Sequence, residues 1–155
     1  MSKIESILFV CLGNICRSPS AEAVFRKKLK ECNIPIYCDS AGTAGYHIGE
    51  RSDARSIQHA EKRGYKMTHL ARQLKPDDFE KFDLILVMDQ DNHHKTISIC
   101  PSRELKAKVK MLTDFCQNVN PGYVPDPYYG TPTDFENVLN IVEDACSGFI
   151  KSLSN

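Results

Sequence analysis

VCLGNICRSPSAE, residues 10–22, joins a short apolar run to a segment with helical spacing. The apolar run, residues 7–10, is typical of a strand that is buried on both faces. Ser18 followed by Pro19 is typical of a helix N-cap with proline at the first helical position. Apolar residues then recur at helical spacing and predict a helix over residues 19–31; they are Ala21, Phe25, Leu29 and Cys32. The quoted stretch is therefore predicted to be a loop between a strand and a helix.

The rest of the chain alternates in the same way between strand-like and helix-like segments. A strand that ends in a turn is predicted at residues 35–42, and two further strands are predicted at residues 82–89 and 107–112. Helices are predicted at residues 53–63, where Gly64 ends the helix, at residues 92–99, and from residue 131 onward. The last helix starts with Thr131 and Pro132, and Asp134 makes a capping-box-like pair with Thr131. A long loop rich in proline, glycine and tyrosine covers residues 113–130.

Strands that alternate with helices predict the fold class. We expect an α/β protein in which one parallel sheet carries helices on both faces, with residues 1–155 forming a single domain. In such folds the ligand binds beyond the carboxyl ends of the strands. The loop at residues 10–22 follows the first strand, while Ser40, Asp89 and Asp126 follow the second, third and fourth. These four segments are predicted to converge at one edge of the sheet.

Composition limits the functions that the chain can have. It has 20 basic and 20 acidic residues, so its formal net charge of zero argues against a nucleic-acid-binding or membrane-surface protein. No apolar stretch approaches the roughly 20 residues that span a bilayer. The N-terminus lacks a signal-peptide pattern and the seven cysteines are an odd number, so we expect a cytoplasmic protein with mostly reduced thiols. The spacing of cysteine and histidine does not favour a zinc site.

The residues of the loop suit the binding of an oxyanion beside a nucleophile. Gly13 and Asn14 tolerate backbone angles that let a loop curl over a helix N-terminus with its amide hydrogens pointing inward. Arg17 adds a planar fork that matches two phosphate oxygens. We expect the pKa of Cys11, at the centre of these groups, to lie well below the ordinary value of about 8.5, with Ser18 donating to its sulfur. This predicts attack of a thiolate on phosphorus and a thiophosphate intermediate.

A simpler interpretation exists for each of these residues alone. A lone cysteine after a strand is usually a small core residue, and a lone arginine is usually solvated. The joint spacing of the nucleophile, the arginine and the small polar residues between and after them favours the catalytic interpretation. The loop has no Walker-type lysine, so it does not support nucleotide hydrolysis by that route.

Five segments of the chain resemble a known family. They are VCLGNICRSPSAE at 10–22, DSAGT at 39–43, HLARQL at 69–74, DLILVMDQDN at 83–92 and PDPYYG at 125–130. Together they resemble the low-molecular-weight protein tyrosine phosphatases, or acid phosphatases, over nearly the whole chain. The resemblance implies a four-stranded parallel sheet flanked by helices and no metal or organic cofactor. It also implies hydrolysis of phosphotyrosine in proteins and of small aryl phosphates through a cysteinyl-phosphate intermediate.

The resemblance implies catalytic roles for three residues. Cys11 resembles the nucleophile, Arg17 the residue that binds the phosphoryl oxygens, and Asp126 the general acid that protonates the phenolate and then activates water. Ser18 resembles the donor that stabilises the sulfur as a leaving group. Phosphate binding and support of the loop are implied for Leu12, Gly13, Asn14, Ile15, Cys16, Ser18, Ser40 and His69.

The resemblance also describes the substrate cleft and its regulation. The residues implied to form the cleft are Ile15, Tyr46, Tyr128 and Tyr129. Cys16 resembles the second loop cysteine, which pairs with Cys11 under oxidation. Phosphate-like oxyanions are expected to inhibit, and the chain is expected to be a monomer or weak dimer that binds neither nucleic acid nor membranes.

Three alternatives stay open at the level of the sequence. An arsenate reductase on the same scaffold uses further cysteines in a redox relay and does not need the acid segment at Asp126 and Pro127. A protein arginine phosphatase typically carries threonine at the position of Ile15, where an apolar side chain favours an aromatic ring over a guanidinium. A non-catalytic phosphate-binding module is disfavoured by the intact nucleophile and acid, and turnover of a simple aryl phosphate would distinguish it.

Overall fold

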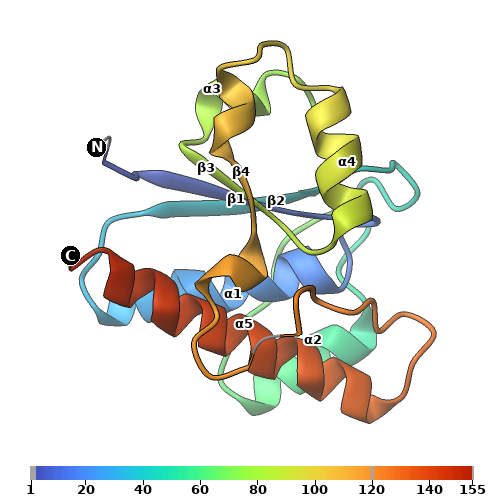
Figure 1. Ribbon diagram of the computed structural model, residues 1–155. Coiled ribbons are helices and arrows are strands. Elements are labelled where there is room, and N and C mark those ends of the chain that lie inside the picture. The colour runs from blue at the N-terminus through green and yellow to red at the C-terminus, as the bar shows by residue number, and fades with distance from the viewer. Residues whose placement is uncertain (1–2, 120, 155) are drawn as a thin grey trace.

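The computed structural model describes residues 3–119 and 121–154, and a four-stranded sheet lies at its centre (Figure 1). The strands are β1 Ser6–Cys11, β2 Tyr37–Gly42, β3 Leu84–Val87 and β4 Val109–Met111. Neighbouring strands are parallel, in the spatial order β2-β1-β3-β4. Val10 of β1 lies opposite Ala41 of β2 and Val87 of β3. The predicted α/β class with a four-stranded parallel sheet is confirmed.

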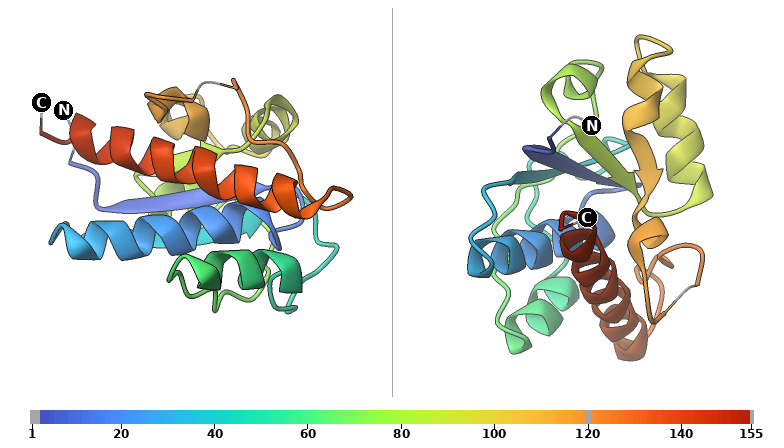
Figure 2. Two further views of the ribbon diagram at one scale, coloured as in Figure 1. Left: turned by 90° about the horizontal axis from the view of Figure 1, so that it is seen from below. Right: turned by 60° about the vertical axis from the view of Figure 1, so that its left-hand side comes forward.

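Helices cover both faces of this sheet, as predicted (Figures 1 and 2). On one side lie α1 Arg17–Glu31 and α5 Pro132–Ser152, with α2 Ala54–Lys62 packed on these two helices. On the other side lie α3 Asp78–Lys81, α4 Gln90–Ser98 and the 3-10 helix η1 Leu105–Lys108. A second 3-10 helix, η2 Leu112–Phe115, follows β4 and packs against α5. Across the described ranges, no helix has the length and apolar character needed to cross a membrane.

The apolar run of β1 is buried on both faces because its side chains alternate between two core clusters. Ile7 and Phe9 belong to the cluster that includes α1 and α5, whereas Leu8 and Val10 belong to the cluster on the α3 side. All four side chains are fully buried. Phe9 also packs against Phe25 of α1, with ring centroids 4.7 Å apart. A continuous apolar run is therefore what a central parallel strand requires.

The start of α1 corrects one prediction. The helix begins at Arg17 with Cys16 as its N-cap, so Ser18 and Pro19 lie inside the first turn. Ser18 is not the N-cap because its hydroxyl is engaged by the Cys11 sulfur and by the Asn14 side chain. The helix therefore begins directly where the loop ends. The backbone N–H groups of its first turn, which have no partner within the helix, lie at the edge of the loop.

The other helix boundaries follow local signals. Gly64 follows α2 with a φ of +87°, as expected of the residue that ends the helix. Helix α4 starts two residues earlier than predicted, because Asp89 is its N-cap and accepts the Asn92 N–H at 2.7 Å. The capping box of Thr131 and Asp134 is confirmed, with the Thr131 amide donating to the carboxylate at 2.7 Å. The one-turn elements α3, η1 and η2 were not predicted, because they are too short for a periodic apolar pattern.

The segment between β4 and α5 is held at two points. Asp144 of α5 accepts the backbone N–H groups of residues 117–119 at 2.9–3.0 Å. Burial alone would raise the pKa of Asp144. The three N–H donors lower it by more than burial raises it, so the pKa of Asp144 lies below the ordinary value. Further along, Val124 is fully buried and its N–H donates at 2.7 Å to the carbonyl of Met88, just after β3. These anchors bring Asp126 to the carboxyl edge of the sheet.

Candidate active site

Residues 11–18, the phosphate loop, curl around the Cys11 sulfur at the end of β1. The sulfur lies 3.0 Å from the Ser18 hydroxyl oxygen and accepts the Asn14 N–H at 3.3 Å. Because the Ser18 oxygen already accepts from the Asn14 side-chain amide at 2.8 Å, its own hydrogen is free to donate to the sulfur. Asn14 has a φ of +58°, the left-handed angle predicted for it. Two donors thus point at one sulfur and stabilise a thiolate.

The Asn14 side chain is held by residues from two other segments. Its amide nitrogen donates to the Ser40 hydroxyl at 3.0 Å. Its oxygen accepts the backbone N–H of Arg72 at 3.0 Å and lies 2.7 Å from Nε2 of His69. A backbone N–H can only donate, which fixes the orientation of the Asn14 amide and makes Nε2 of His69 a donor. The structure therefore places both predicted support residues, Ser40 and His69, directly against Asn14.

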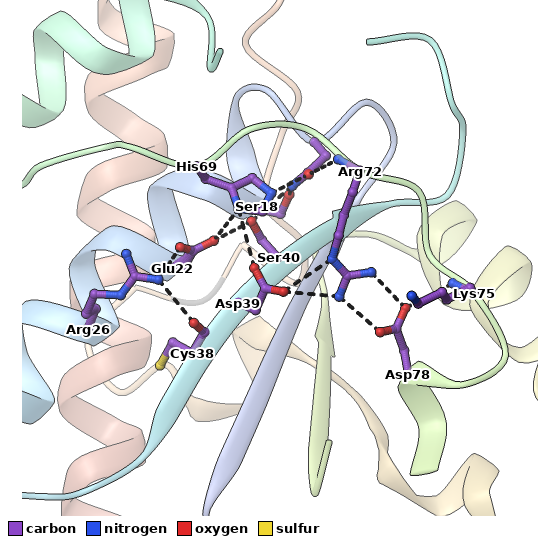
Figure 3. A network of polar contacts seen from close by, with 11 residues as sticks. Ser18, Glu22, Arg26, Cys38, Asp39, Ser40, His69, Arg72, Lys75 and Asp78 are labelled. Atoms are coloured by element: carbon purple, nitrogen blue, oxygen red, sulfur yellow. Dashed lines mark hydrogen bonds and ion pairs between the residues drawn. The ribbon is translucent and has the colours of Figure 1, made fainter. Parts of the chain in front are cut away.

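A network of charged side chains, anchored by the buried Glu22, lies behind these contacts (Figure 3). Glu22 of α1 is 2 % exposed, accepts from the Ser40 hydroxyl at 2.7 Å and lies 3.2 Å from Nδ1 of His69. Asp39 of β2 lies 3.4 Å from the same nitrogen and accepts from Arg72. Glu22, Asp39 and His69 are the one group of three metal-type ligands within the described residues, with ligand atoms inside 4.8 Å. Their atoms already pair with one another and with Ser40 and Arg72, so we interpret them as support for the loop.

Arg17 is a buried cation that joins the phosphate loop to the far side of the site. Its side chain is 3 % exposed, and Nη1 donates to Asp89 at 2.7 Å and to the Val124 carbonyl at 3.0 Å. Its Nη2 lies 3.7 Å from the Asp126 carboxylate. Burial lowers the pKa of Arg17, but the negative charges of Cys11, Asp89 and Asp126 outweigh this and raise it. The guanidinium is therefore charged and fixed in its plane.

One cavity of about 220 Å³ opens over the phosphate loop. Its lining residues are Cys11, Leu12, Gly13, Ile15, Cys16, Arg17, Tyr46, His47, Asp126, Tyr128 and Tyr129. Tyr46 and Tyr129 stand at the mouth, 72 % and 97 % exposed, and the Tyr128 ring packs edge-on against Tyr129 with centroids 4.9 Å apart. The structure brings the predicted nucleophile, arginine, acid and cleft residues into this cavity. The other predicted residues, Asn14, Ser18, Ser40 and His69, lie behind it.

Cys16 lines the same cavity but differs chemically from the first loop cysteine. Its side chain is buried at the N-terminus of α1. Burial raises the pKa of the Cys16 thiol to about 12, and a hydrogen bond with Ser56 only partly offsets this. Cys16 is therefore a neutral thiol near pH 7 and a poor nucleophile in this conformation.

Four residues at the site were not predicted as site residues. Asp89 pairs with Arg17, and its position at the end of the third predicted strand was a usable signal. His47 lines the cavity, and its Nδ1 lies 3.3 Å from the Glu50 carboxylate. Glu22 supports the loop, and Arg72 contacts Asn14 through its backbone; both lie in segments that resemble the family, but no local pattern indicates these contacts.

Comparison with known proteins identifies the family. The sequence model described as low molecular weight phosphotyrosine protein phosphatase matches residues 6–155. The human low molecular weight phosphotyrosine protein phosphatase is 41 % identical over 153 residues, covering 95 % of this chain and 94 % of the relative. Among solved structures, the Entamoeba histolytica protein tyrosine phosphatase with Hepes in its active site has a TM-score of 0.93, 42 % identity and 97 % coverage of both chains.

A structure with a ligand extends this comparison. Vibrio vulnificus Wzb in complex with benzylphosphonate has a TM-score of 0.85 and 30 % identity, covering 97 % of this chain and 99 % of that one. A cysteine at the end of β1, a buried arginine and an aspartate share one cavity in a parallel α/β fold. The chain belongs to the low molecular weight phosphotyrosine protein phosphatase family.

Proposed function

We propose that this chain hydrolyses phosphotyrosine in proteins and small aryl phosphates through a phosphocysteine intermediate on Cys11. The observation that carries the proposal is the shared cavity over the phosphate loop, which Cys11, Arg17 and Asp126 all line. A nucleophile, an oxyanion-binding cation and a proton donor are the three groups that this reaction needs. Family membership supports the same activity.

The first step transfers the phosphoryl group to sulfur. Loop N–H groups and the Arg17 guanidinium bind the phosphoryl oxygens, and the Cys11 thiolate attacks phosphorus. The S–P bond forms as the P–O bond to the aryl group breaks, and Asp126 gives its proton to the departing phenolate oxygen. The donors from Ser18 and Asn14 stabilise the thiolate before attack.

The second step releases phosphate. The Asp126 carboxylate takes a proton from water, the water oxygen attacks phosphorus, and the S–P bond breaks. The electron pair of that bond returns to the Cys11 sulfur, where the Ser18 hydroxyl again donates. The products are inorganic phosphate and the starting enzyme with Asp126 protonated. Inorganic phosphate and similar oxyanions therefore fit the same loop and are proposed inhibitors.

The cavity walls support an aromatic substrate. Ile15, Tyr46 and Tyr128 present apolar or aromatic surface above the sulfur, which suits the ring of a phosphotyrosine. Benzylphosphonate, the ligand of the related Wzb, combines such a ring with a phosphonate group. A guanidinium substrate would place its charge against Ile15, so this observation favours tyrosine phosphate over arginine phosphate.

We further propose that oxidation controls the enzyme through Cys11 and Cys16. Both thiols line the cavity and lie five positions apart in the phosphate loop. Their sulfurs would lose two electrons to an oxidant such as hydrogen peroxide, through a sulfenic acid on Cys11 that Cys16 then attacks with loss of water. We also propose that residues 1–155 form one domain, which acts in the cytoplasm as a monomer or weak dimer.

A substrate panel tests the proposed function against its rivals. Peptides with phosphotyrosine, phosphoserine or phosphoarginine are assayed for phosphate release, and arsenate reduction is assayed with added thiol. We expect turnover of the phosphotyrosine peptide and of nitrophenyl phosphate, with much slower release from the other two peptides. Faster release from phosphoarginine, or arsenate reduction without aryl phosphatase activity, would replace the proposal with one of the alternatives.

A further inference from the structure

Arg55 lies outside the catalytic cavity yet contacts the segment that carries Asp126. It stands in the first turn of α2, with its side chain 45 % exposed. Its Nε and Nη2 form a fork on the Asp53 carboxylate, at 3.1 Å and 2.9 Å. The same Nη2 donates to the backbone carbonyl of Tyr128 at 3.0 Å. One guanidinium therefore joins the N-terminus of α2 to the acid segment.

Two aromatic rings fix the plane of this guanidinium. Its central carbon lies 4.7 Å from the ring centroid of Phe135, in the first turn of α5, and 5.6 Å from that of Tyr128. Arg55 thus links the start of α2 to Tyr128 and Phe135, which lie far from it in the sequence. An exposed ion pair alone adds little to stability, so we look for the consequence of these contacts in the position of the acid segment.

The contacts of Arg55 continue in both directions to the reacting groups. Toward the phosphate loop, the Asp53 N–H donates to the Ile15 carbonyl at 2.8 Å. Toward the acid, the Tyr128 N–H donates to the Asp126 carboxylate at 3.1 Å. Pro127, between Asp126 and Tyr128, has a fixed φ and makes this short stretch stiff. An unbroken series of contacts therefore runs from the phosphate loop through Arg55 to the acid.

A second arginine holds the other side of the acid segment. Arg17 donates to the carbonyl of Val124, two residues before Asp126, while Arg55 donates to the carbonyl of Tyr128, two residues after it. Holding the backbone on both sides of an aspartate limits where its carboxyl group can lie. General acid catalysis depends on this position, because the proton must reach the leaving oxygen at hydrogen-bond distance.

We propose that Arg55 is a positioning residue for the general acid. Through Asp53 and the Tyr128 backbone it sets the distance between the Asp126 carboxyl group and the phosphate loop. The inference rests on the proposed role of Asp126 as the acid. Arg55 itself is not among the residues that line the catalytic cavity. It should matter for the step that needs the proton and not for the binding of phosphate.

The test compares leaving groups in Arg55→Ala, Arg55→Lys, Asp126→Ala and the Arg55→Ala/Asp126→Ala double variant. Phenyl phosphate needs the proton, whereas nitrophenyl phosphate has a better leaving group. We expect Arg55→Ala to lower kcat/KM, which reports the step that releases the aryl group, by about 10-fold on phenyl phosphate and by less than about 2-fold on nitrophenyl phosphate. Lysine can reach one acceptor but lacks the fork, so Arg55→Lys should lie between wild type and Arg55→Ala.

Three further measurements separate positioning from a general loss of structure. The inhibition constant of inorganic phosphate should not change in Arg55→Ala, because the phosphate loop is intact. The double variant should be no slower than Asp126→Ala alone, since both changes remove the same proton transfer. Arg103→Ala, in the exposed segment before η1 at the opposite end of the molecule from α2, is the control and should match wild type (Figure 1).

The outcomes distinguish the two proposals. Two outcomes would overturn the positioning role while leaving the acid in place. One is an equal loss of activity in Arg55→Ala on both substrates. The other is a loss in the double variant that equals the product of the two single-variant losses. If Asp126→Ala itself loses the same factor on both substrates, the acid assignment fails, and the role of Arg55 fails with it.

Discussion

The Asp126 carboxylate lies 3.7 Å from Nη2 of Arg17, in the same cavity as the Cys11 sulfur. The proposed general acid and the proposed phosphate-binding cation are therefore neighbours before any substrate is bound. A phosphoryl group bound by Arg17 would bring its leaving oxygen toward Asp126. Because of this arrangement, the proton transfer from Asp126 to the leaving oxygen can be tested directly.

Removing the acid should affect poor leaving groups most. Tyrosine's phenol has an ordinary pKa of about 10, so it departs slowly as phenolate without a proton. We expect Asp126→Ala to lower kcat/KM on phenyl phosphate by about 10²- to 10⁴-fold and on nitrophenyl phosphate by much less. The measurement is the slope of log kcat/KM against leaving-group pKa, which should become steeper in the variant.

The pH profile gives an independent check on the same residue. Turnover needs a Cys11 thiolate and a protonated Asp126 at once, so the wild type should show a bell-shaped profile with an acidic optimum. Asp126→Ala should lose the decline on the alkaline side, which reports deprotonation of the acid. A variant that keeps the full bell shape would exclude Asp126 as the acid.

Arg17 should not tolerate lysine. Nη1 of Arg17 contacts both Asp89 and Val124, which fixes the fork that binds the phosphoryl oxygens. An ammonium keeps the charge but cannot bind two oxygens in a plane. We expect kcat on nitrophenyl phosphate to fall by about 10²-fold or more in Arg17→Lys, with Arg103→Lys as the exposed control. Retention of more than about a fifth of the wild-type kcat would show that charge alone is sufficient.

Oxidation should be reversible only while Cys16 is present. Peroxide is expected to inactivate the wild type, and dithiothreitol is expected to restore it through a Cys11–Cys16 disulfide. Because burial holds the pKa of Cys16 near 12, the disulfide should form faster as the pH rises. In Cys16→Ser, recovery should fall, while Cys32→Ser, at an exposed thiol after α1, should behave like wild type.

If Cys16→Ser and wild type recover the same activity after dithiothreitol, Cys16 has only a packing role. Geometry sets a further condition, since a disulfide needs α carbons within about 7 Å. Mass spectrometry of the peroxide-treated wild type, without reductant, should find the loop peptide two hydrogens lighter.

Asp144 should stabilise the fold in a pH-dependent way. Asp144→Ala leaves three N–H groups of residues 117–119 without their acceptor and should lower the free energy of unfolding by about 1–3 kcal/mol at pH 7. The folded-state pKa of this carboxyl is lowered, so its contribution is present above the unfolded pKa of about 3.9 and is lost as the pH falls through the folded pKa.

Urea unfolding followed by circular dichroism measures this difference at several pH values. The gap between wild type and Asp144→Ala should shrink on acidification below about pH 4. Asp114→Ala, at an exposed carboxylate in η2, is the control and should unfold like wild type. A gap that does not change with pH would mean that the variant acts by disturbing α5 packing.

Residues at the carboxyl ends of strands were the most predictable part of the site. Parallel strands end at one edge of the sheet, so the segments that carry Asp89 and Asp126 were expected to meet the loop that follows β1, and Ser40 joins them from inside β2. The structure places Ser40 against Asn14, Asp89 against Arg17, and Asp126 in the cavity. The predicted strands and long helices are likewise present, because their apolar periodicity is a strong signal.

Residues that act through contacts distant in the sequence were not predictable. Glu22 and Arg26 have the spacing of an ordinary pair on a helix surface, yet Glu22 is buried because Ser40 and His69 reach it from β2 and from the segment after α2. Ser18 looked like an N-cap for a similar reason: its sequence context is right, but the Cys11 sulfur competes for its hydroxyl. Local patterns give no information on such tertiary competition.

Trapping the covalent intermediate tests the central claim most directly. The wild type is mixed with an aryl phosphate carrying radiolabelled phosphorus, quenched in alkaline denaturant, digested and mapped. The account predicts label on the peptide that contains Cys11, bound to sulfur, and neither label nor turnover in Cys11→Ser. Full turnover with no label on this peptide, or substantial turnover in Cys11→Ser, would contradict it.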